Sequence, residues 1–162
     1  MNPTGIPGLD AEESEAWQAL IATTIWLPAA LDLQLQRDQG ISHFEYGVMS
    51  MLVRQEAQTM RIKELARATN GALSRLSRVL DRLESRGWVE RRPHPDDGRV
   101  TLAVLTREGR RKVAAATPGH IATVRSLVFE QLSTEQVREL AAMLQPVVQA
   151  AGPEGACASR MA

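Results

Sequence analysis

The sequence predicts a mainly α-helical fold with one small β-hairpin, and three observations predict it. Apolar residues recur at helical spacing between residues 73 and 83, which indicates an amphipathic helix. A glycine and two short strand-like runs around a turn follow directly, within residues 87–105. Apolar helical segments lie on both sides, within residues 11–40 and 106–151. The expected order is helices, then a hairpin, then helices again.

A long first helix is expected from Ala11 to about Arg37. Its apolar residues lie on more than one side, so the helix needs cover on more than one side. Pro28 is expected to kink it, because proline removes a backbone hydrogen bond and crowds the preceding turn. A chain of 162 residues has little material to cover so long a helix. We therefore expect a second copy of the chain to pack against it.

The next segment carries a capping box, in which Ser42 caps a helix and Glu45 reaches back to it. This second helix is expected to run to about Gln55. Residues 60–62 are expected to form a short strand, and residues 63–68 a short helix. The helix that follows is the element around which the rest of the chain is organised.

The helix within residues 70–86 has one apolar face and one polar face. Asn70 is its expected N-cap. The apolar positions are Leu73, Leu76, Val79, Leu80 and Leu83. The polar positions are Ser74, Arg75, Ser77, Arg78 and Arg82. Two interpretations of the polar face are open: a solvated charged surface, or a surface that reads the major groove of DNA, where arginine matches the edge of guanine.

A glycine ends this helix, and a hairpin follows it. Gly87 is expected to adopt a left-handed backbone, with Leu83 and Trp88 as the apolar pair of a Schellman ending. Strands are expected at residues 88–92 and 100–105. The second strand carries on one face Val100, Leu102 and Val104. A hairpin directly after an arginine-bearing helix is the order of a winged helix-turn-helix.

The hairpin tip carries the sharpest prediction about single residues. The dipeptide Asp97-Gly98 is expected to form the turn. The Asp97 carboxylate is expected to orient the guanidinium of Arg99 toward a narrow minor groove. The alternative is that the two residues form only a surface ion pair, worth ~0–1 kcal/mol. Arg91 and Arg92 are expected to contact phosphates. The expected DNA-binding residues are Ser74, Arg75, Ser77, Arg78, Arg82, Arg91, Arg92, Asp97 and Arg99.

Four motifs together resemble the MarR family of bacterial transcriptional regulators. They lie at residues 76–84, 87–89, 97–99 and 105–109, and the resemblance extends over roughly residues 12–150. It implies a homodimer that binds a pseudo-palindromic operator, usually as a repressor that is released by a small ligand or by oxidation. It also implies a wing with an Asp-x-Arg pair, which residues 97–99 match.

Two further helices are expected after the hairpin. Thr106 is expected to cap the first of them, and the Thr-Pro-Gly run at residues 117–119 to bend or break it. Ser133 and Gln136 form a capping box that begins the second, and Pro146 is expected to bend or fray its end. The first of these helices begins with the cations Arg107, Arg110, Arg111 and Lys112. Positive charges at this end of a helix oppose the helix dipole, so these cations need a negatively charged partner. Nearby phosphates and the acidic first helix are the two alternatives.

The chain is expected to consist of a DNA-binding head and flanking helices. Residues 41–105 are expected to form a winged helix-turn-helix DNA-binding domain, and residues 11–40 and 106–151 the flanking dimerisation helices. The alternative is a monomer in which the outer helices pack only on the head. Residues 1–10 and 152–162 are expected to be disordered tails.

The charges are unevenly distributed although the net charge is zero. Residues 61–112 hold 14 arginines and lysines against 7 acidic residues, whereas the rest of the chain holds 5 against 12. This asymmetry suggests a basic working segment on an acidic scaffold. Only Lys63 and Lys112 are lysines, and arginine suits groove and phosphate recognition.

Several classes of function and location are not expected. The sequence lacks glycine-rich phosphate motifs, zinc-protease motifs and cysteine pairs at metal spacing, so we expect no enzyme, no metal and no other cofactor. It also lacks a signal peptide and an apolar stretch of ~18 residues, so we expect a cytoplasmic protein without a membrane partner. Cys157 is the single cysteine and lies in the tail, so thiol redox sensing is not expected.

The resemblance implies a ligand pocket where the first, second and fifth helices meet the DNA-binding head. Its candidate lining residues are Trp26, His43, Phe44, Tyr46 and Met51. The alternative for each is packing in the core or in the dimer interface. The expected effector is a small aromatic or other apolar molecule.

The expected function is that of a homodimeric, sequence-specific transcriptional regulator that binds double-stranded DNA. We expect a ligand-relieved repressor with a pseudo-palindromic operator. The alternative is a winged-helix module that binds another protein and does not bind DNA. The arginine-rich exposed face of residues 70–86 favours the first.

Overall fold

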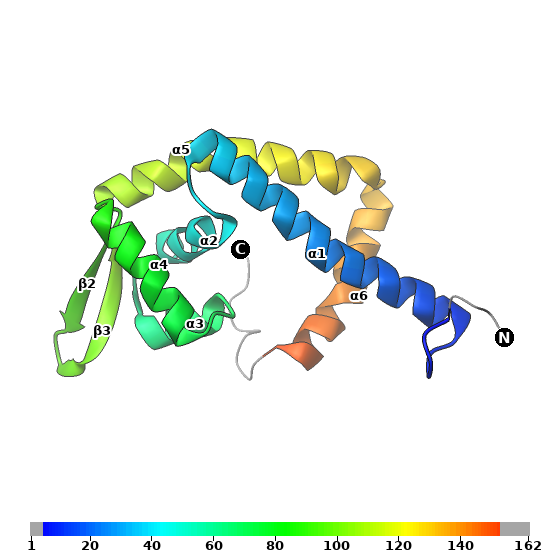
Figure 1. The fold of residues 1–162 in the computed structure, drawn as a ribbon, viewed down its shortest axis with the longest axis horizontal. Helices are drawn as coiled ribbons and strands as arrows, with labels where there is room; N and C mark the ends of the chain where they lie inside the picture. The colour runs from blue at the N-terminus through cyan, green and yellow to red at the C-terminus, as the bar shows by residue number, and fades with distance from the viewer. Residues whose placement is uncertain (1–4, 153–162) are drawn as a thin grey trace.

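The computed structural model describes residues 5–152, which form six α-helices, one short 3-10 helix and a three-stranded antiparallel sheet (Figure 1). The elements in chain order are α1 (Ala11–Gln39), α2 (His43–Val53), β1 (Thr59–Arg61), α3 (Ile62–Ala68), α4 (Leu73–Ser85), β2 (Val89–His94), β3 (Asp97–Leu105), α5 (Arg107–Leu127), η1 (Phe129–Gln131) and α6 (Thr134–Ala151). The mainly helical fold with a small β-wing is therefore confirmed. No helix of this described part is long and apolar enough to cross a membrane.

The expected disordered tails lie mostly outside the described residues, and so does Cys157. Residues 5–10 are described and form a turn that precedes α1, in which the backbone N–H of Ile6 donates to the side chain of Ser14 at 3.2 Å. The chain before α1 is therefore held to the helix over these six residues.

The long helices α1 and α5 pack on each other and on α2, whereas the β2–β3 hairpin projects beside α4 at one end of the molecule (Figure 1). The α6 helix begins near the end of α5 that is far from the hairpin and turns away from α5 (Figure 1). The strand order of the sheet is β1-β3-β2, so β2 is an edge strand. The α4 helix and the hairpin thus share one end of the fold.

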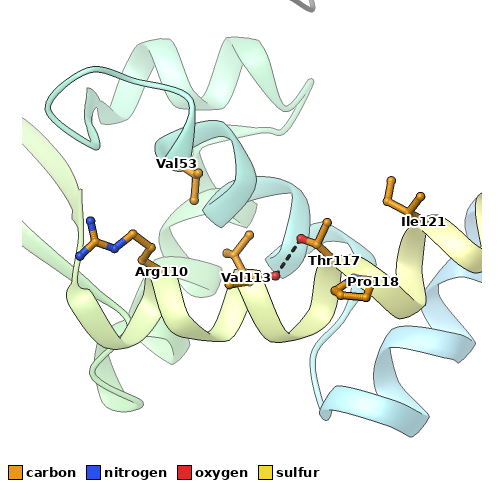
Figure 2. A pocket seen from close by; sticks show the side chains of 7 residues that line it. Val53, Arg110, Val113, Thr117, Pro118 and Ile121 are labelled. Atoms are coloured by element: carbon orange, nitrogen blue, oxygen red, sulfur yellow. Dashed lines mark hydrogen bonds between the residues drawn. The ribbon is translucent and has the colours of Figure 1, made fainter.

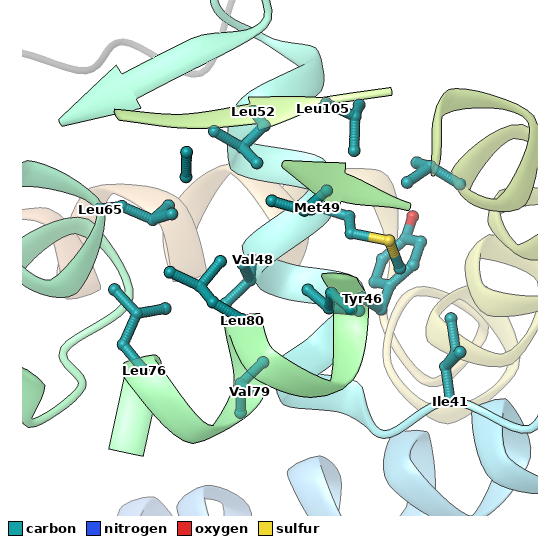
Figure 3. Close-up of a cluster of buried hydrophobic side chains, with 14 of the residues drawn as sticks. Ile41, Tyr46, Val48, Met49, Leu52, Leu65, Leu76, Val79, Leu80 and Leu105 are labelled. Carbon is teal, nitrogen blue, oxygen red and sulfur yellow. The ribbon is translucent and has the colours of Figure 1, made fainter. Parts of the chain in front are cut away.

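The hydrophobic core surrounds α2, which contacts α1, α3, α5 and β3 (Figure 3). Its largest fully buried side chains are Leu35, Ile41, Val48, Met49, Leu52, Leu65, Leu76, Leu80, Leu83 and Val89. By contrast, α6 has no buried residue in the single chain. The core therefore stabilises the head, and the outer helices keep much of their apolar surface exposed.

Helix starts follow the expected capping signals at three places. The capping boxes that begin at Ser42 and Ser133 are both formed, and Thr106 caps α5 by accepting a hydrogen bond from the N–H of Gly109 at 3.0 Å. A further capping box, at Asp10 and Glu13, begins α1. These boxes satisfy backbone N–H groups that a helix start otherwise leaves unpaired.

The expected cap at Asn70 is wrong, because Asn70 serves the end of the preceding helix. The N-cap of α4 is Ala72, which makes no side-chain capping bond. Asn70 has a left-handed backbone with φ 46°, and the N–H of Gly71 donates to the carbonyl of Ala66 at 2.9 Å. This is the Schellman pattern, in which asparagine is an accepted substitute for glycine.

At residues 117–119 a bend or a break was expected, and the break is wrong, since α5 runs through Pro118 without interruption. Buried residues flank the proline on both sides, Val113 and Ala116 before it and His120 after it. Packing of these residues offsets the missing backbone hydrogen bond. Helices α1 and α6 likewise continue through their single prolines.

The end of α4 has the expected Schellman geometry. Gly87 has φ 69°, its N–H donates to the carbonyl of Glu84 at 2.8 Å, and the N–H of Trp88 donates to Leu83 at 2.9 Å. A Cβ is disfavoured in this left-handed backbone, which explains the glycine. The ending fixes the direction in which the chain enters β2.

The hairpin turn lies two residues earlier than expected. His94 pairs with Asp97, so Pro95 and Asp96 form the turn, and the Asp97-Gly98 dipeptide belongs to β3. The β2 strand continues through Pro93, which an edge strand tolerates because one side of its backbone has no partner. The expected turn at Asp97-Gly98 is therefore corrected.

One expectation about an apolar face also needs correction. In β3, Val100, Leu102 and Val104 share one face as expected and are half-buried, whereas on the other face Ala103 is fully buried and Leu105 nearly so. In α4 the expected core residue Leu73 is 50% exposed, because the helix begins at this residue and the core lies further along it.

Candidate nucleic-acid interface

The exposed side of α4 carries the residues expected to read DNA. Ser74, Arg75 and Arg78 are exposed, and Ser77 is half-buried beside the hairpin. Arg78 makes no hydrogen bond or ion pair with any residue in the described range 5–152. Its guanidinium is therefore available to an external acceptor, and an arginine fork matches the O6 and N7 atoms of guanine.

Arg75 is turned toward α2. Its guanidinium carbon lies 4.3 Å from the centre of the Phe44 ring, which is the distance of a cation–π contact. The contact orients Arg75 along the side of α4 and leaves the side chain exposed. Phe44 thereby supports an exposed arginine of α4.

Arg82 pairs with Glu45 of α2, with 2.9 Å between Arg82 Nε and Glu45 Oε1. The Glu45 side chain is 6% exposed, and its other oxygen accepts the N–H of Ser42 at 2.8 Å. Burial alone would raise the pKa of Glu45, but the bonds from Ser42 and Arg82 outweigh it and hold the pKa below its ordinary value. The carboxylate therefore stays charged and ties α4 to α2.

The arginines of the hairpin differ in their surroundings. Arg91 is held by side chains of α4, whereas Arg92 pairs with Glu90 on its own strand at 2.6 Å and is mostly exposed. Arg99 lies near the tip and is exposed. The cations that reach solvent on the hairpin are thus Arg92 and Arg99.

The expected ion pair between Asp97 and the Arg99 guanidinium is not formed. The Asp97 carboxylate instead accepts the backbone N–H of Arg99 at 3.0 Å. A short carboxylate reaches the backbone N–H two residues further on, which is a common local bond of aspartate. Asp97 therefore shapes the backbone at the tip and leaves the guanidinium free to turn outward.

Two of the four cations that begin α5, Arg111 and Lys112, have partners in the protein. Arg111 pairs with Glu108 at 2.6 Å, and Lys112 donates to Gln39 at the end of α1 at 3.0 Å. The ammonium of Lys112 also lies 5.4 Å from the ring centre of Trp88. Glu108 of α5, Gln39 of α1 and Trp88 thus partly offset the unfavourable placement of Arg111 and Lys112 at a helix start.

A cleft of about 800 Å³ lies between α1, α2 and α4. It is lined by Pro28, Ala29, Asp32, Ser42, His43, Phe44, Gly47, Met51, Thr69, Arg75, Arg78, Val79 and Arg82. Of the expected pocket residues, His43, Phe44 and Met51 line it, but Trp26 and Tyr46 do not. Trp26 is 72% exposed on α1, and the Tyr46 hydroxyl lies 3.1 Å from Thr117 of α5.

Sequence reasoning missed that three arginines of α4 also line this cleft. Arg75, Arg78 and Arg82 are spaced three and four residues apart, so they share one side of the helix. That spacing was visible in the sequence, but the neighbouring α2 was not. The same helix therefore presents cations both to solvent and to the cleft.

Two histidines meet at the junction of α2 and α5. The ring centres of His43 and His120 are 5.6 Å apart, and those of Tyr46 and His120 are 4.6 Å apart. Burial lowers the pKa of both histidines. The Asp32 carboxylate partly opposes this for His43, and the nearby His43 adds to it for His120. Within residues 5–152 no group of three or more metal-ligating side chains is placed to hold a metal ion.

A second, apolar groove of about 520 Å³ follows α5 (Figure 2). Its lining residues are Val53, Arg110, Val113, Ala114, Thr117, Pro118 and Ile121. The Thr117 hydroxyl donates to the carbonyl of Val113 at 2.8 Å, so it offers no free donor to the groove. The groove is a continuation of the exposed apolar surface of α5.

The fold and this arrangement define a winged helix-turn-helix protein with long flanking helices. A family model described as MarR family matches residues 41–101. The chain is 38% identical to Sco3205, a MarR family transcriptional regulator from Streptomyces coelicolor solved in complex with DNA. That match covers 90% of this chain and 94% of the other, with a TM-score of 0.84. AbsC, a MarR family transcriptional regulator from the same organism, is 30% identical, with 89% and 97% of the two chains covered and a TM-score of 0.82.

The chain therefore belongs to the MarR family. Among curated relatives, the HTH-type transcriptional repressor YetL of Bacillus subtilis (strain 168) is 30% identical over 98 residues, which are 60% of this chain. The chain spans 58% of the length of YetL. Because these relatives are transcriptional regulators, the expectation that the chain is not an enzyme is confirmed.

Proposed function

We propose that the chain is a transcriptional repressor that binds double-stranded DNA as a homodimer. The single observation that carries the proposal is the exposed, unpaired guanidinium of Arg78 on α4, beside a hairpin that exposes Arg99. Such a helix fits the major groove, and such a hairpin reaches the adjacent minor groove or backbone. The DNA in the Sco3205 structure and the repressor name of YetL support the proposal.

Each DNA-facing residue has a distinct proposed role. Ser74, Ser77 and Arg78 approach base edges from the first half of α4. Arg75 contacts a flanking phosphate once DNA competes with Phe44. Arg82 contacts one through its terminal nitrogens while its Nε stays paired with Glu45. On the hairpin, Arg92 binds phosphate and Arg99 enters the minor groove, with Asp97 shaping the backbone of the tip.

The outer helices form the proposed dimer interface, which comprises residues 11–40 and 106–151 around a head of residues 41–105. Their exposed large apolar side chains are Trp17, Ile25, Trp26, Leu33, Ile121, Leu127, Phe129, Met143, Val147 and Val148. Burial of apolar surface stabilises by roughly 25 cal/mol per Å². In the single chain α6 has no buried residue, so its apolar side gains little of this stabilisation. In the proposed dimer, a second copy of the chain covers these side chains in both outer regions, residues 11–40 and 106–151.

Relief of repression is proposed to occur through the cleft between α1, α2 and α4. Phe44 and Met51 offer an apolar surface, and Arg75, Arg78 and Arg82 offer cations. This combination suits a small aromatic or other apolar molecule that carries an anionic group. A ligand that binds these arginines withdraws them from DNA, because one guanidinium cannot serve both.

The proposal is tested by selecting duplexes from a randomised pool and measuring their affinity by fluorescence anisotropy over a range of salt concentrations. We expect recovery of a pseudo-palindromic duplex whose affinity falls steeply with salt. Arg54→Ala, at an exposed arginine that forms the C-cap of α2, is the matched control for Arg78→Ala and should keep the parent's affinity. Failure to recover any duplex would contradict the proposal and favour a protein-binding module.

A further inference from the structure

The guanidinium of Arg91 is enclosed by groups of α4. One terminal nitrogen lies 2.8 Å from the Asp81 carboxylate and 2.9 Å from the backbone carbonyl of Ser77, and the other pairs with Glu84. The Ser77 hydroxyl oxygen lies 3.4 Å from the first of these two nitrogens. The backbone N–H of Arg91 also donates to Glu84 at 2.8 Å. The Arg91 side chain is only 25% exposed.

From this geometry we infer that Arg91 is a positioning residue of the DNA-binding surface and does not itself bind phosphate. Arg91, Asp81 and Glu84 form a clamp that sets the angle between the hairpin and α4. The inference rests on the proposed function, and it assigns the clamp a task within it: to hold Arg99 at a fixed offset from Arg78.

The position of the clamp along the hairpin supports this role. The chain leaves α4 at Gly87, and Arg91 pairs across the sheet with Ala103, which is fully buried. Beyond Arg91 the hairpin is mostly exposed. The base of the hairpin is fixed by the pairing of β3 with β1 and by the buried Val89 and Leu105. Arg91 adds the attachment of β2 to α4 at the level where the hairpin leaves the core, so it limits how far the exposed part can swing away from α4.

The neighbouring residue Arg92 provides an internal comparison. Arg92 pairs with Glu90, and both side chains are more than half exposed, whereas Arg91 is mostly enclosed. Exposed ion pairs contribute little to stability, so Arg92 leaves Glu90 for a phosphate at small cost. Arg91 would have to leave two carboxylates and a carbonyl, which is much less favourable.

The charge around Arg91 predicts whether removal of the Glu84 charge strengthens or weakens DNA binding. Two carboxylates surround a single guanidinium, so the cluster carries no positive charge to attract phosphate. If Arg91 bound phosphate, removing the charge of Glu84 would free the arginine and strengthen DNA binding. If the clamp positions the hairpin, the same change weakens DNA binding because the hairpin loosens.

The experiment compares Glu84→Gln with Glu90→Gln, which removes one carboxylate from the same region without touching the clamp. Affinity is measured by anisotropy on the duplex that the parent protein recovers from a randomised pool. We expect Glu84→Gln to weaken binding roughly tenfold and Glu90→Gln to bind as tightly as the parent or more tightly. The double variant Arg91→Gln with Glu84→Gln should bind no more weakly than Arg91→Gln alone.

Two further readouts separate positioning from phosphate binding and from misfolding. Arg91→Gln should leave the slope of log affinity against log salt unchanged, whereas loss of a phosphate contact would reduce it by about 0.9. Circular dichroism checks the fold, and Asp81→Asn replaces Glu84→Gln if that variant does not fold. Tighter binding by Glu84→Gln, or a reduced slope for Arg91→Gln, would overturn the inference alone. A parent protein that recovers no duplex would instead contradict the proposed function.

Discussion

Gly109, near the start of α5, lies against the backbone of Trp88, so closely that a Cβ at residue 109 would stand 2.1 Å from the Trp88 carbonyl oxygen. The Thr106 hydroxyl donates to the carbonyl of Gly87 at 2.7 Å beside this contact. The end of α4 and the beginning of α5 are therefore joined through backbone groups. The joint fixes the start of α5 against the end of α4.

Gly109→Ala is predicted to lower the free energy of unfolding by roughly 1–3 kcal/mol, because the new methyl group meets a backbone atom that cannot move aside. Gly47→Ala in α2 is the matched control, since its Cβ would meet nothing within 4 Å and alanine favours the helix. Urea unfolding of both variants checks the prediction. Equal midpoints for Gly109→Ala and the parent would show that the contact is not tight.

Stability is predicted to fall as the pH drops below about 6.5, the ordinary pKa of histidine. The folded chain lowers the pKa of His43 and of His120, so the unfolded chain binds more protons in the range between the unfolded and folded pKa values. Their contribution is complete above the unfolded pKa and is lost as the pH falls toward the folded pKa. Urea midpoints measured over this range check it.

His120→Gln should flatten this pH dependence, because it removes one of the two facing rings. His94→Gln, in the hairpin, should retain the parent's pH dependence. If the stability of His120→Gln fell with pH as steeply as that of the parent, the histidine pair would not cause the loss of stability at acidic pH.

Arg78→Ala and Arg92→Ala are predicted to weaken DNA binding in different ways. Arg78→Ala should cost about 1–3 kcal/mol and relax the base preference at one position of each half-site, because a guanine contact is lost. Arg92→Ala should weaken all duplexes alike and reduce the salt slope by about 0.9 per phosphate contact. Repeating the duplex selection with each variant separates the two outcomes. An unchanged base preference for Arg78→Ala would remove its assignment to a base edge.

Met143→Asp is predicted to dissociate the dimer without unfolding the chain. Met143 is 62% exposed in the single chain, so a charge there costs the monomer little but would be buried in the proposed interface. Light scattering should report the mass of one chain, and circular dichroism an unchanged helix content. A variant that keeps the parent's mass would place the interface elsewhere.

The sequence predicted best those features that neighbouring residues determine. The capping boxes at Ser42 and Ser133 and the Schellman ending at Gly87 are formed as expected. Each is set by residues within one or two turns of the chain, and their geometry needs no distant partner. For the same reason the helices, the hairpin and their order were predictable.

The sequence predicted poorly those features that depend on distant residues. Arg82 pairs with Glu45, which is 37 residues away, and nothing in the local pattern of α4 indicates this partner. Pro118 remains helical because packing around it outweighs a local breaking signal. Asn70 and Asp97 carry signals that fit two structures each, and tertiary packing selects between them.

The most direct test of the proposed function is the mass of the complex that the chain forms with a selected duplex. Sedimentation equilibrium should find two chains of 17.8 kDa bound to each duplex, because two copies of α4 are needed to engage successive grooves. A complex that contains one chain, or a chain that sediments alone in the presence of the duplex, would contradict it.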